Sequence, residues 1–239
     1  MHSSPSLFRW SLEIFLEPSV AIRRMRESPP ILAFGLTFAI FCAAMWWSIL
    51  SVNERAMARL LADGVHPVVV EQSCLDLHRE KIVRVAAAPM EIALYASAAM
   101  IALCMASWVC GRSPPYRALL TAAVVAQAPQ LLSLATDLEL LWNDGPEVTL
   151  DLRPILRCST SVAAFFATGA YPSWMHCALE EISPFTIWSA GLVGIAAREL
   201  GGASRLGAFA VSHAALLLRI AWSTGRTLAI SELVRRGVL

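Results

Sequence analysis

Residues 31–52 read ILAFGLTFAIFCAAMWWSILSV, a run of 22 residues without a charged side chain. As an α-helix this run is about 33 Å long, enough to cross the ~30 Å hydrocarbon core of a bilayer. Pro29 and Pro30 precede it and separate it from a more polar segment. Because lipid offers no hydrogen bonds to the backbone, such a run crosses a membrane as a helix. The sequence therefore predicts a transmembrane helix here.

The composition of the whole chain also indicates a membrane protein. Of its 239 residues, 57% are hydrophobic and 15% are charged, against about 45–50% and 25% in soluble domains. The mean hydropathy is +0.59. These values exclude a disordered chain, and a formal net charge of +1 gives no basic excess for binding nucleic acid. We expect an all-α, polytopic membrane protein.

Four further apolar runs bring the expected number of transmembrane helices to five. The third helix contains Pro129 at its middle, where we expect a kink, and the fourth is short. Residues 159–170 are apolar too, but they are too few for a full span and predict a short re-entrant or interfacial segment. The five expected spans are 31–52, 85–110, 118–138, 184–197 and 206–222.

Three regions follow from this pattern. Residues 1–29 carry apolar side chains at helical spacing, which predicts an amphipathic interfacial helix rather than a cleaved signal peptide. Residues 30–223 form the membrane domain, and residues 224–239 form an amphipathic tail. The cluster at residues 23–26 lies close to the first span and favours a cytoplasmic N-terminus. Arginine supplies 18 of the 19 basic residues, a bias that indicates a GC-rich coding sequence. We therefore expect a bacterial protein of the inner membrane.

Polar side chains inside the apolar runs are the candidate functional residues, because ionisable groups are costly at membrane depth. In the structural interpretation, Arg219 neutralises Glu91 or Asp137 and holds the spans together. In the functional one, the same group of side chains surrounds an ion or proton path with His213 as a relay. The group consists of Glu91, Gln127, Gln130, Asp137, Glu139, His213 and Arg219.

A second group of candidates falls in the loops on the side opposite to the N-terminus. Cys74 and His78 have the spacing of two metal ligands on one helical face. A disulfide between two of Cys74, Cys158 and Cys177 is an alternative on an oxidising side. No CxxC pair is present, so we expect unpaired thiols and neither a metal nor another cofactor. The group consists of His66, Cys74, His78, Cys158, His176 and Cys177.

Short segments along the chain resemble a known family. The fourth run opens with Pro184-Phe185-Thr186-Ile187-Trp188. Residues 17–30 precede the first span, and residues 117–132 contain Pro129. Together they resemble bacterial members of the Ypt/Rab-interacting (Yip) membrane protein family over roughly residues 12–222. Ala196 departs from the pattern, since the family tends to have glycine there. The resemblance implies five spans, a cytoplasmic N-terminus and no catalytic activity.

Catalytic motifs give no competing interpretation. A Walker A loop, a GxSxG elbow, an HExxH helix and a dinucleotide fingerprint are all absent from the sequence. We therefore expect a non-catalytic scaffold, or an accessory subunit of a larger membrane complex, whose partners are lipids and other membrane proteins. The alternative is a small transporter or channel component that uses the buried polar residues, with Pro129 as its hinge.

Overall fold

The computed structural model describes residues 13–25, 31–62, 67–144, 160–165 and 172–235. Every regular element in these ranges is a helix, which confirms the expected all-α class for this part of the chain. Three of the helices, α3, α4 and α9, are longer than a membrane crossing requires. The elements are α2 (Pro18–Met25), α3 (Ile31–Ala62), α4 (Pro67–Val109), α5 (Tyr116–Val125), α6 (Ala128–Asp144), η1 (Val162–Phe165), α7 (Ser173–Glu180), α8 (Pro184–Glu199) and α9 (Arg205–Arg235).

Four stretches in the described ranges are long and apolar enough to cross a membrane. They are Gly35–Val52 in α3, Ile92–Val109 in α4, Tyr116–Glu139 across α5 and α6, and Arg205–Gly225 in α9. The expected fourth span corresponds to α8, which has 16 residues. A helix of that size is about 24 Å long, shorter than the hydrocarbon core of a typical bilayer.

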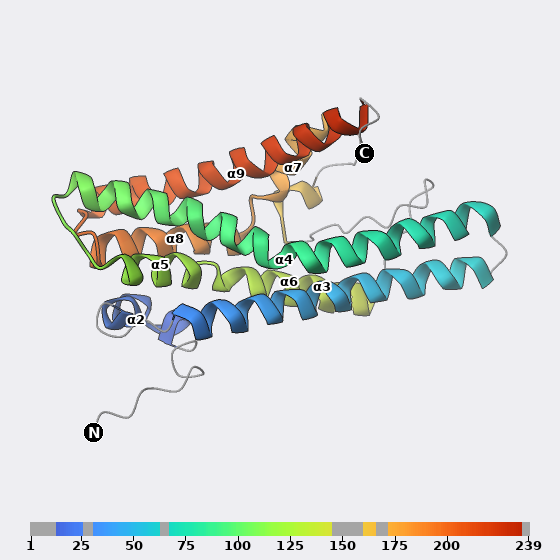
Figure 1. Ribbon diagram of the computed structural model, residues 1–239, viewed down its shortest axis with the longest axis horizontal. Coiled ribbons are helices and arrows are strands. Elements are labelled where there is room, and N and C mark those ends of the chain that lie inside the picture. Colours follow the sequence, from blue (N-terminus) through green and yellow to red (C-terminus); the bar gives the residue numbers. More distant parts are fainter. Residues whose placement is uncertain (1–12, 26–30, 63–66, 145–159, 166–171, 236–239) are drawn as a thin grey trace, which may run out of the picture.

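The helices form a bundle with α5 in its interior (Figure 1). Helix α5 packs against α4, α3, α2 and α8, and six of its ten residues are buried. The shared core is rich in alanine, including Ala118, Ala122 and Ala126 at four-residue spacing. Small side chains of this kind let helix backbones approach closely in a membrane.

The third expected span is broken where the sequence predicts a kink. Helix α5 ends at Val125 and α6 begins at Ala128. Pro129 has no N–H, and in a continuous helix its ring would clash with the carbonyl of Val125. The chain instead makes a turn in which the N–H of Gln127 donates to the carbonyl of Val124 at 3.0 Å. The kink is thereby confirmed.

Two tight turns lie together at one end of the bundle. Helix α4 ends at Val109 and is followed by Gly111, whose φ of 64° lies in the left-handed region that favours glycine. The N–H of Arg112 then donates to the carbonyl of Ser107 at 2.9 Å, as in a Schellman motif. Helices α8 and α9 are joined by residues 200–204, where Gly202 has a φ of 72°. The last two helices therefore form a tight hairpin.

The N-terminal segment packs against the bundle as far as it is described. Ala21, Ile22 and Met25 of α2 are buried, as is Ile14 before it. Helix α2 contacts α5 and α8, and Arg23 forms an ion pair with Glu199 at the end of α8 (3.0 Å). The amphipathic character expected for this segment agrees with residues 13–25, whereas residues 1–12 and 26–30 lie outside the described part of the chain.

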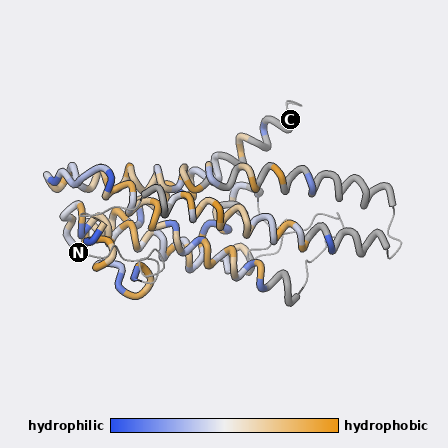
Figure 2. Tube along the Cα trace, turned by 60° about the horizontal axis from the view of Figure 1, so that its bottom comes forward, coloured by the Kyte–Doolittle hydropathy of each residue, from blue (hydrophilic) through white to orange (hydrophobic). Residues whose placement is uncertain are grey.

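Three helices continue beyond the expected spans. Helix α3 runs through Asn53 to Ala62, because residues 53–62 contain neither proline nor glycine to end it. It pairs with α4, and Figure 1 shows the two extending together past α6 and α8. Helix α9 continues to Arg235 through the start of the expected tail. Figure 2 shows that hydrophobic residues are distributed along the helices of the bundle.

Candidate functional site

A buried ion pair joins α9 to the segment before α8. The Nε of Arg219 donates to Oε2 of Glu181 at 2.6 Å, and each side chain is only 13% exposed. Arg219 lies 14 residues into α9, about 21 Å from the end that carries the two turns. It also precedes Trp222 by about one helical turn. The pair therefore lies within the length of helix that is suited to the apolar layer.

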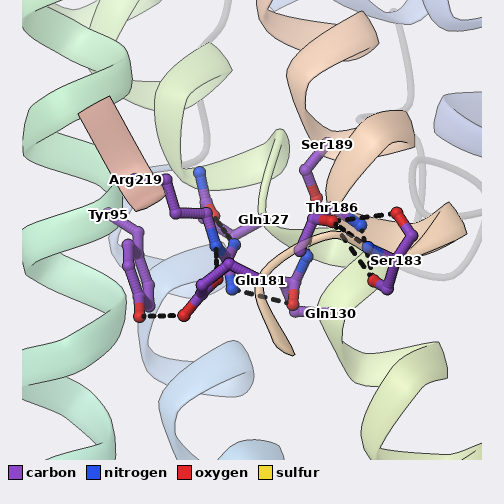
Figure 3. Close-up of polar contacts among 8 residues, drawn as sticks. All are labelled: Tyr95, Gln127, Gln130, Glu181, Ser183, Thr186, Ser189 and Arg219. Carbon is purple, nitrogen blue, oxygen red and sulfur yellow. Dashed lines mark hydrogen bonds and ion pairs between the residues drawn. The ribbon is translucent and has the colours of Figure 1, made fainter. Parts of the chain in front are cut away.

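The position of Glu181 is fixed by hydrogen bonds of the two residues that follow it, Ile182 and Ser183. Helix α7 ends at Glu180, and the carbonyl of Ile182 accepts from the N–H of Val162 at 2.8 Å. Ser183 then caps α8. Its N–H donates to Oγ1 of Thr186 at 2.8 Å, and its Oγ accepts from the N–H of Thr186 at 3.1 Å. This reciprocal capping box holds the link rigid, and Figure 3 shows Glu181 directed toward Arg219.

Two glutamines beside the helix break complete the surroundings of Arg219. Its terminal nitrogens donate to Oε1 of Gln130 at 3.0 Å and, at the long distance of 3.5 Å, to Oε1 of Gln127. The amide nitrogen of Gln127 donates to the carbonyl of Ala123, and that of Gln130 donates to Oγ of Ser189. Each amide thus accepts from the guanidinium and donates elsewhere, which fixes its orientation.

Tyr95 of α4 closes the cluster from the opposite side. The guanidinium carbon of Arg219 lies 4.0 Å from the centre of the tyrosine ring, a cation–π arrangement. The hydroxyl of Tyr95 donates to Oε1 of Glu181 at 3.2 Å. Both carboxylate oxygens of Glu181 therefore have a donor, and one side chain from α4 contacts both members of the ion pair.

The cluster has no net charge, because one guanidinium faces one carboxylate among neutral side chains. It connects α4, the α5–α6 break, α8 and α9 in one polar network (Figure 3). Burying two charges is costly unless they are paired and hydrogen-bonded. The extra donors and acceptors around this pair meet that condition, so the network is well suited to hold the helices in one arrangement.

A narrow cleft borders the network. It is lined by polar side chains, among them Tyr95, Gln127 and Arg219, and by small apolar side chains of α4, α8 and α9. Such an arrangement can hold water or a small polar group against the guanidinium. The lining residues are Tyr95, Ala98, Ala99, Gln127, Thr186, Ser189, Ala190, Val193, Ala215, Leu216 and Arg219.

The structure brings together three of the seven polar residues singled out in the sequence, namely Arg219, Gln127 and Gln130. The expected ion-pair partner of Arg219 was Glu91 or Asp137. The carboxylate that faces Arg219 is Glu181, so the prediction of Asp137 is wrong. Asp137 lies about two helical turns beyond Gln130 on α6. Glu139 is exposed, and the side chain of Glu91 lies outside the described part of the structure.

His213 does not join the polar cluster. It is exposed on α9, where its Nδ1 donates to the carbonyl of Phe209 at 2.9 Å and its ring contacts the Phe209 ring. Six residues separate it from Arg219, which corresponds to a rotation of about 240° around the helix. A relay from His213 to the ion pair is therefore not formed, because the two side chains point in different directions.

Glu181 and Tyr95 belong to the site although the sequence analysis did not single them out. Glu181 lies three residues before Pro184 in a segment that reads as a loop, and loop carboxylates are usually exposed. Its expected height along the bundle axis could have identified it. It precedes α8, which returns toward the two turns, so it lies at the same end of the bundle as Arg219.

The residues that resemble the family motif form the first turn and a half of α8. Pro184 occupies the first helical position, where its missing N–H costs nothing, and Thr186 belongs to the capping box. The rings of Trp188 and Phe15 pack edge to face with 5.2 Å between centroids, while Phe185 is half-buried and Ile187 is exposed. The motif therefore begins α8 and contacts the N-terminal segment.

The loop histidines and cysteines fall largely outside what the structure describes. Residues 66 and 158 are not described, nor are the side chains of Cys74, His176 and Cys177. Within the described ranges, no three His, Cys, Asp or Glu side chains are grouped in a way that could hold a metal ion. Among the described thiols, Cys104 and Cys110 are free.

No protein-family model, curated protein or solved structure matches the chain. Its function must therefore be inferred from the chemistry of its own residues.

Proposed function

We propose that the protein is a non-catalytic, multi-pass membrane protein that acts as a scaffold or accessory subunit of a larger membrane complex. The observation that carries this proposal is the length of the α3–α4 pair. With 32 and 43 residues, the two helices are about 48 and 64 Å long. A membrane crossing takes about 30 Å, so both helices extend beyond it. The extension, residues 53–62 of α3 and 67–84 of α4, is a helical arm for a partner to bind.

The ion pair supports a structural role for the bundle beneath this arm. Arg219 and Glu181 neutralise each other, and two amide oxygens and one hydroxyl form further hydrogen bonds with the pair. A network of this kind stabilises one arrangement of α4, α8 and α9. A scaffold needs such a rigid base, because an arm presented by a mobile bundle pays a larger ordering cost when it binds.

The proposal includes a topology. We count α8 as a fifth, short crossing, place the segment around η1 at the interface, and assign the N-terminus to the cytoplasmic side of a bacterial inner membrane. The exposed arginines at the end of the bundle near α2 support this orientation through the positive-inside rule. It is also the topology that the resemblance to the Yip family implies, and we propose membership on the motif at the start of α8.

The test compares the intact protein with a variant whose arm is shorter. Deleting residues 55–61 and 68–74 removes seven residues from each helix, which is close to two turns and keeps the same faces in contact. Native membranes are extracted gently, the complexes are separated on native gels, and comigrating proteins are identified by mass spectrometry. A control deletes residues 229–235, which removes seven residues from the end of α9, as many as each arm helix loses.

We expect the intact protein and the control to migrate in a large complex, and the short-arm variant to migrate alone while still inserted. Solitary migration of the intact protein would contradict the scaffold assignment. Unchanged assembly of the short-arm variant would show that the arm is not the part of the protein that binds the partner.

The cleft beside Arg219 favours a second candidate, a small transporter or channel component. Tyr95, Gln127 and Arg219 line this cleft together with residues of α4, α8 and α9. Under this alternative, proteoliposomes that contain the intact protein show ion or proton flux, and Glu181→Gln changes its pH dependence. The absence of flux from folded, reconstituted protein excludes it.

A further inference from the structure

One end of the bundle carries exposed arginines that form no ion pair with any described residue. They lie in or beside the two turns that join α4 to α5 and α8 to α9. All four side chains are exposed, so their guanidinium groups are open to a ligand. The four are Arg112, Arg117, Arg198 and Arg205, referred to below as the turn arginines.

The turn arginines come from neighbouring parts of the fold. A Cβ built on Gly202 would lie 2.9 Å from Nε of Arg112, so the side chain of Arg112 crosses the α8–α9 turn. Arg198 lies in the last turn of α8, and Arg205 is the first residue of α9. Arg117, the second residue of α5, follows the other turn. Two adjacent turns thus present four guanidinium groups at the same end.

The acidic residues at this end do not balance the positive charge. Helix α2 adds Arg23 and Arg24, which pair with Glu199 and Glu13 respectively. Glu17 is the other described acidic residue here, so six arginines face three glutamates. The excess is concentrated in the turn arginines, because the other two arginines are already paired.

Large apolar side chains surround the turn arginines. Trp108 is 83% exposed and Tyr116 is 66% exposed, and Val109 and Leu206 are exposed as well. Tryptophan and tyrosine are enriched where lipid headgroups meet the hydrocarbon core. Arginine side chains at the same level extend toward the headgroups with their charge in the polar layer. The turn arginines therefore lie where phospholipid phosphates are concentrated.

We propose that the turn arginines form a binding surface for the phosphodiester headgroups of anionic phospholipids. The planar guanidinium donates two parallel hydrogen bonds to a phosphate and remains charged at all physiological pH values. The surrounding aromatic and aliphatic side chains favour a phosphate that carries acyl chains over a free phosphate ion. This surface is separate from the arm, so the inference does not depend on the proposed scaffold function.

The experiment measures lipid preference in the full-length protein. Purified protein in a neutral detergent is titrated with phosphatidylglycerol and, separately, with phosphatidylcholine of the same acyl chains, and bound lipid is counted by native mass spectrometry. Inorganic phosphate is added as a competitor to distinguish a lipid site from a phosphate site. The variant carries Arg112→Gln, Arg117→Gln, Arg198→Gln and Arg205→Gln. A control of equal charge change carries Arg55→Gln, Arg59→Gln, Arg79→Gln and Arg84→Gln in the arm.

We expect the intact protein and the arm control to prefer phosphatidylglycerol at least tenfold, and the turn variant to bind both lipids equally. Loss of one arginine should weaken the preference about fivefold, the effect of one basic residue near an anionic surface. Single variants therefore keep the test decisive if the fourfold variant does not fold. Equal binding of both lipids by the intact protein, an unchanged preference in the turn variant, or displacement of the lipid by millimolar phosphate would each overturn the proposal.

Discussion

Glu181 and Arg219 meet at 2.6 Å although 38 residues separate them in the sequence. The contact ties the start of α8 to α9, the most peripheral of the candidate spans, of which only 6% is buried. Helix α9 otherwise packs mainly along one face against α8, with smaller contacts to α7 and α4. The ion pair therefore contributes strongly to fixing the position of α9 along its axis relative to the neighbouring helices.

Removing one member of this pair should destabilise the bundle strongly. Arg219→Gln leaves the carboxylate of Glu181 buried without its cation, and Glu181→Gln leaves the guanidinium without its anion. Each single variant should cost about 3–5 kcal/mol of unfolding free energy. The double variant should cost less than either, because two neutral amides leave no uncompensated charge. Titration with a denaturing detergent, followed by circular dichroism, measures these differences.

The ion pair between Arg23 and Glu199 is the matched control. Its arginine is 64% exposed, and exposed pairs contribute about 0–1 kcal/mol. Arg23→Gln should therefore change little under the same conditions. A double variant at positions 181 and 219 whose loss equals the sum of the two single losses would show that the two side chains do not act as a pair.

Tyr95 should contribute through two separable contacts. Tyr95→Phe removes the hydroxyl that donates to Glu181 at 3.2 Å but keeps the ring beside Arg219. It should cost about 0.5–1.5 kcal/mol, the net value of one hydrogen bond. Tyr95→Leu also removes the cation–π contact and should cost about 0.5–2 kcal/mol more. Thermal unfolding in detergent distinguishes the steps, with exposed Tyr116→Phe as the neutral control. Equal losses in the two Tyr95 variants would rule out the ring contact.

Much of the fold follows from local patterns in the sequence. The apolar runs identify the helices of the bundle, Pro129 identifies the break between α5 and α6, and Gly201-Gly202 identifies the hairpin turn. Each depends on backbone chemistry within a few residues. The continuation of α3 past Asn53 was harder to predict, because a polar residue after an apolar run resembles a helix boundary. Without proline or glycine, the helix simply continued into its pairing with α4.

The site was predictable only in part, because its partners come from distant segments. An arginine at membrane depth indicates a buried anion, and glutamines beside a proline indicate interhelical hydrogen bonds. Those arguments selected Arg219, Gln127 and Gln130 but could not choose among carboxylates. The choice of Glu181 depends on the packing of α7 and η1, which directs the link before α8 inward. No periodicity in the sequence records that packing.

His213 should be dispensable for folding and for any activity of the polar cluster. Its side chain is exposed on α9 and bonds locally to the carbonyl of Phe209. His213→Leu should change the unfolding free energy by no more than about 0.5 kcal/mol, as for other surface positions. Gln130→Leu is the contrasting variant, since it removes an acceptor of Arg219 and a donor to Ser189. It should cost about 1–3 kcal/mol. A larger loss in His213→Leu than in Gln130→Leu would contradict the assignment.

The crossing of α8 and α9 at Gly194 should be intolerant of a single added methyl group. A Cβ at this position would lie 2.7 Å from the carbonyl oxygen of Ala208 and would also collide with the hydroxyl of Ser212. The Ser212 side chain can rotate away, but a backbone carbonyl moves only with its helix. Gly194→Ala should therefore push α9 outward and cost about 1–3 kcal/mol, as overpacking does in other cores.

Gly191, three residues earlier in α8, separates this effect from helix propensity. A Cβ there would have no atom within 4 Å, and alanine is favoured over glycine within a helix by about 1 kcal/mol. Gly191→Ala should thus leave stability unchanged or raise it, while Gly194→Ala lowers it. Because displacement of α9 would also separate Arg219 from Glu181, Gly194→Ala should reduce the coupling energy measured for that pair. Full coupling in the Gly194→Ala background would mean that the crossing point and the ion pair position α9 independently.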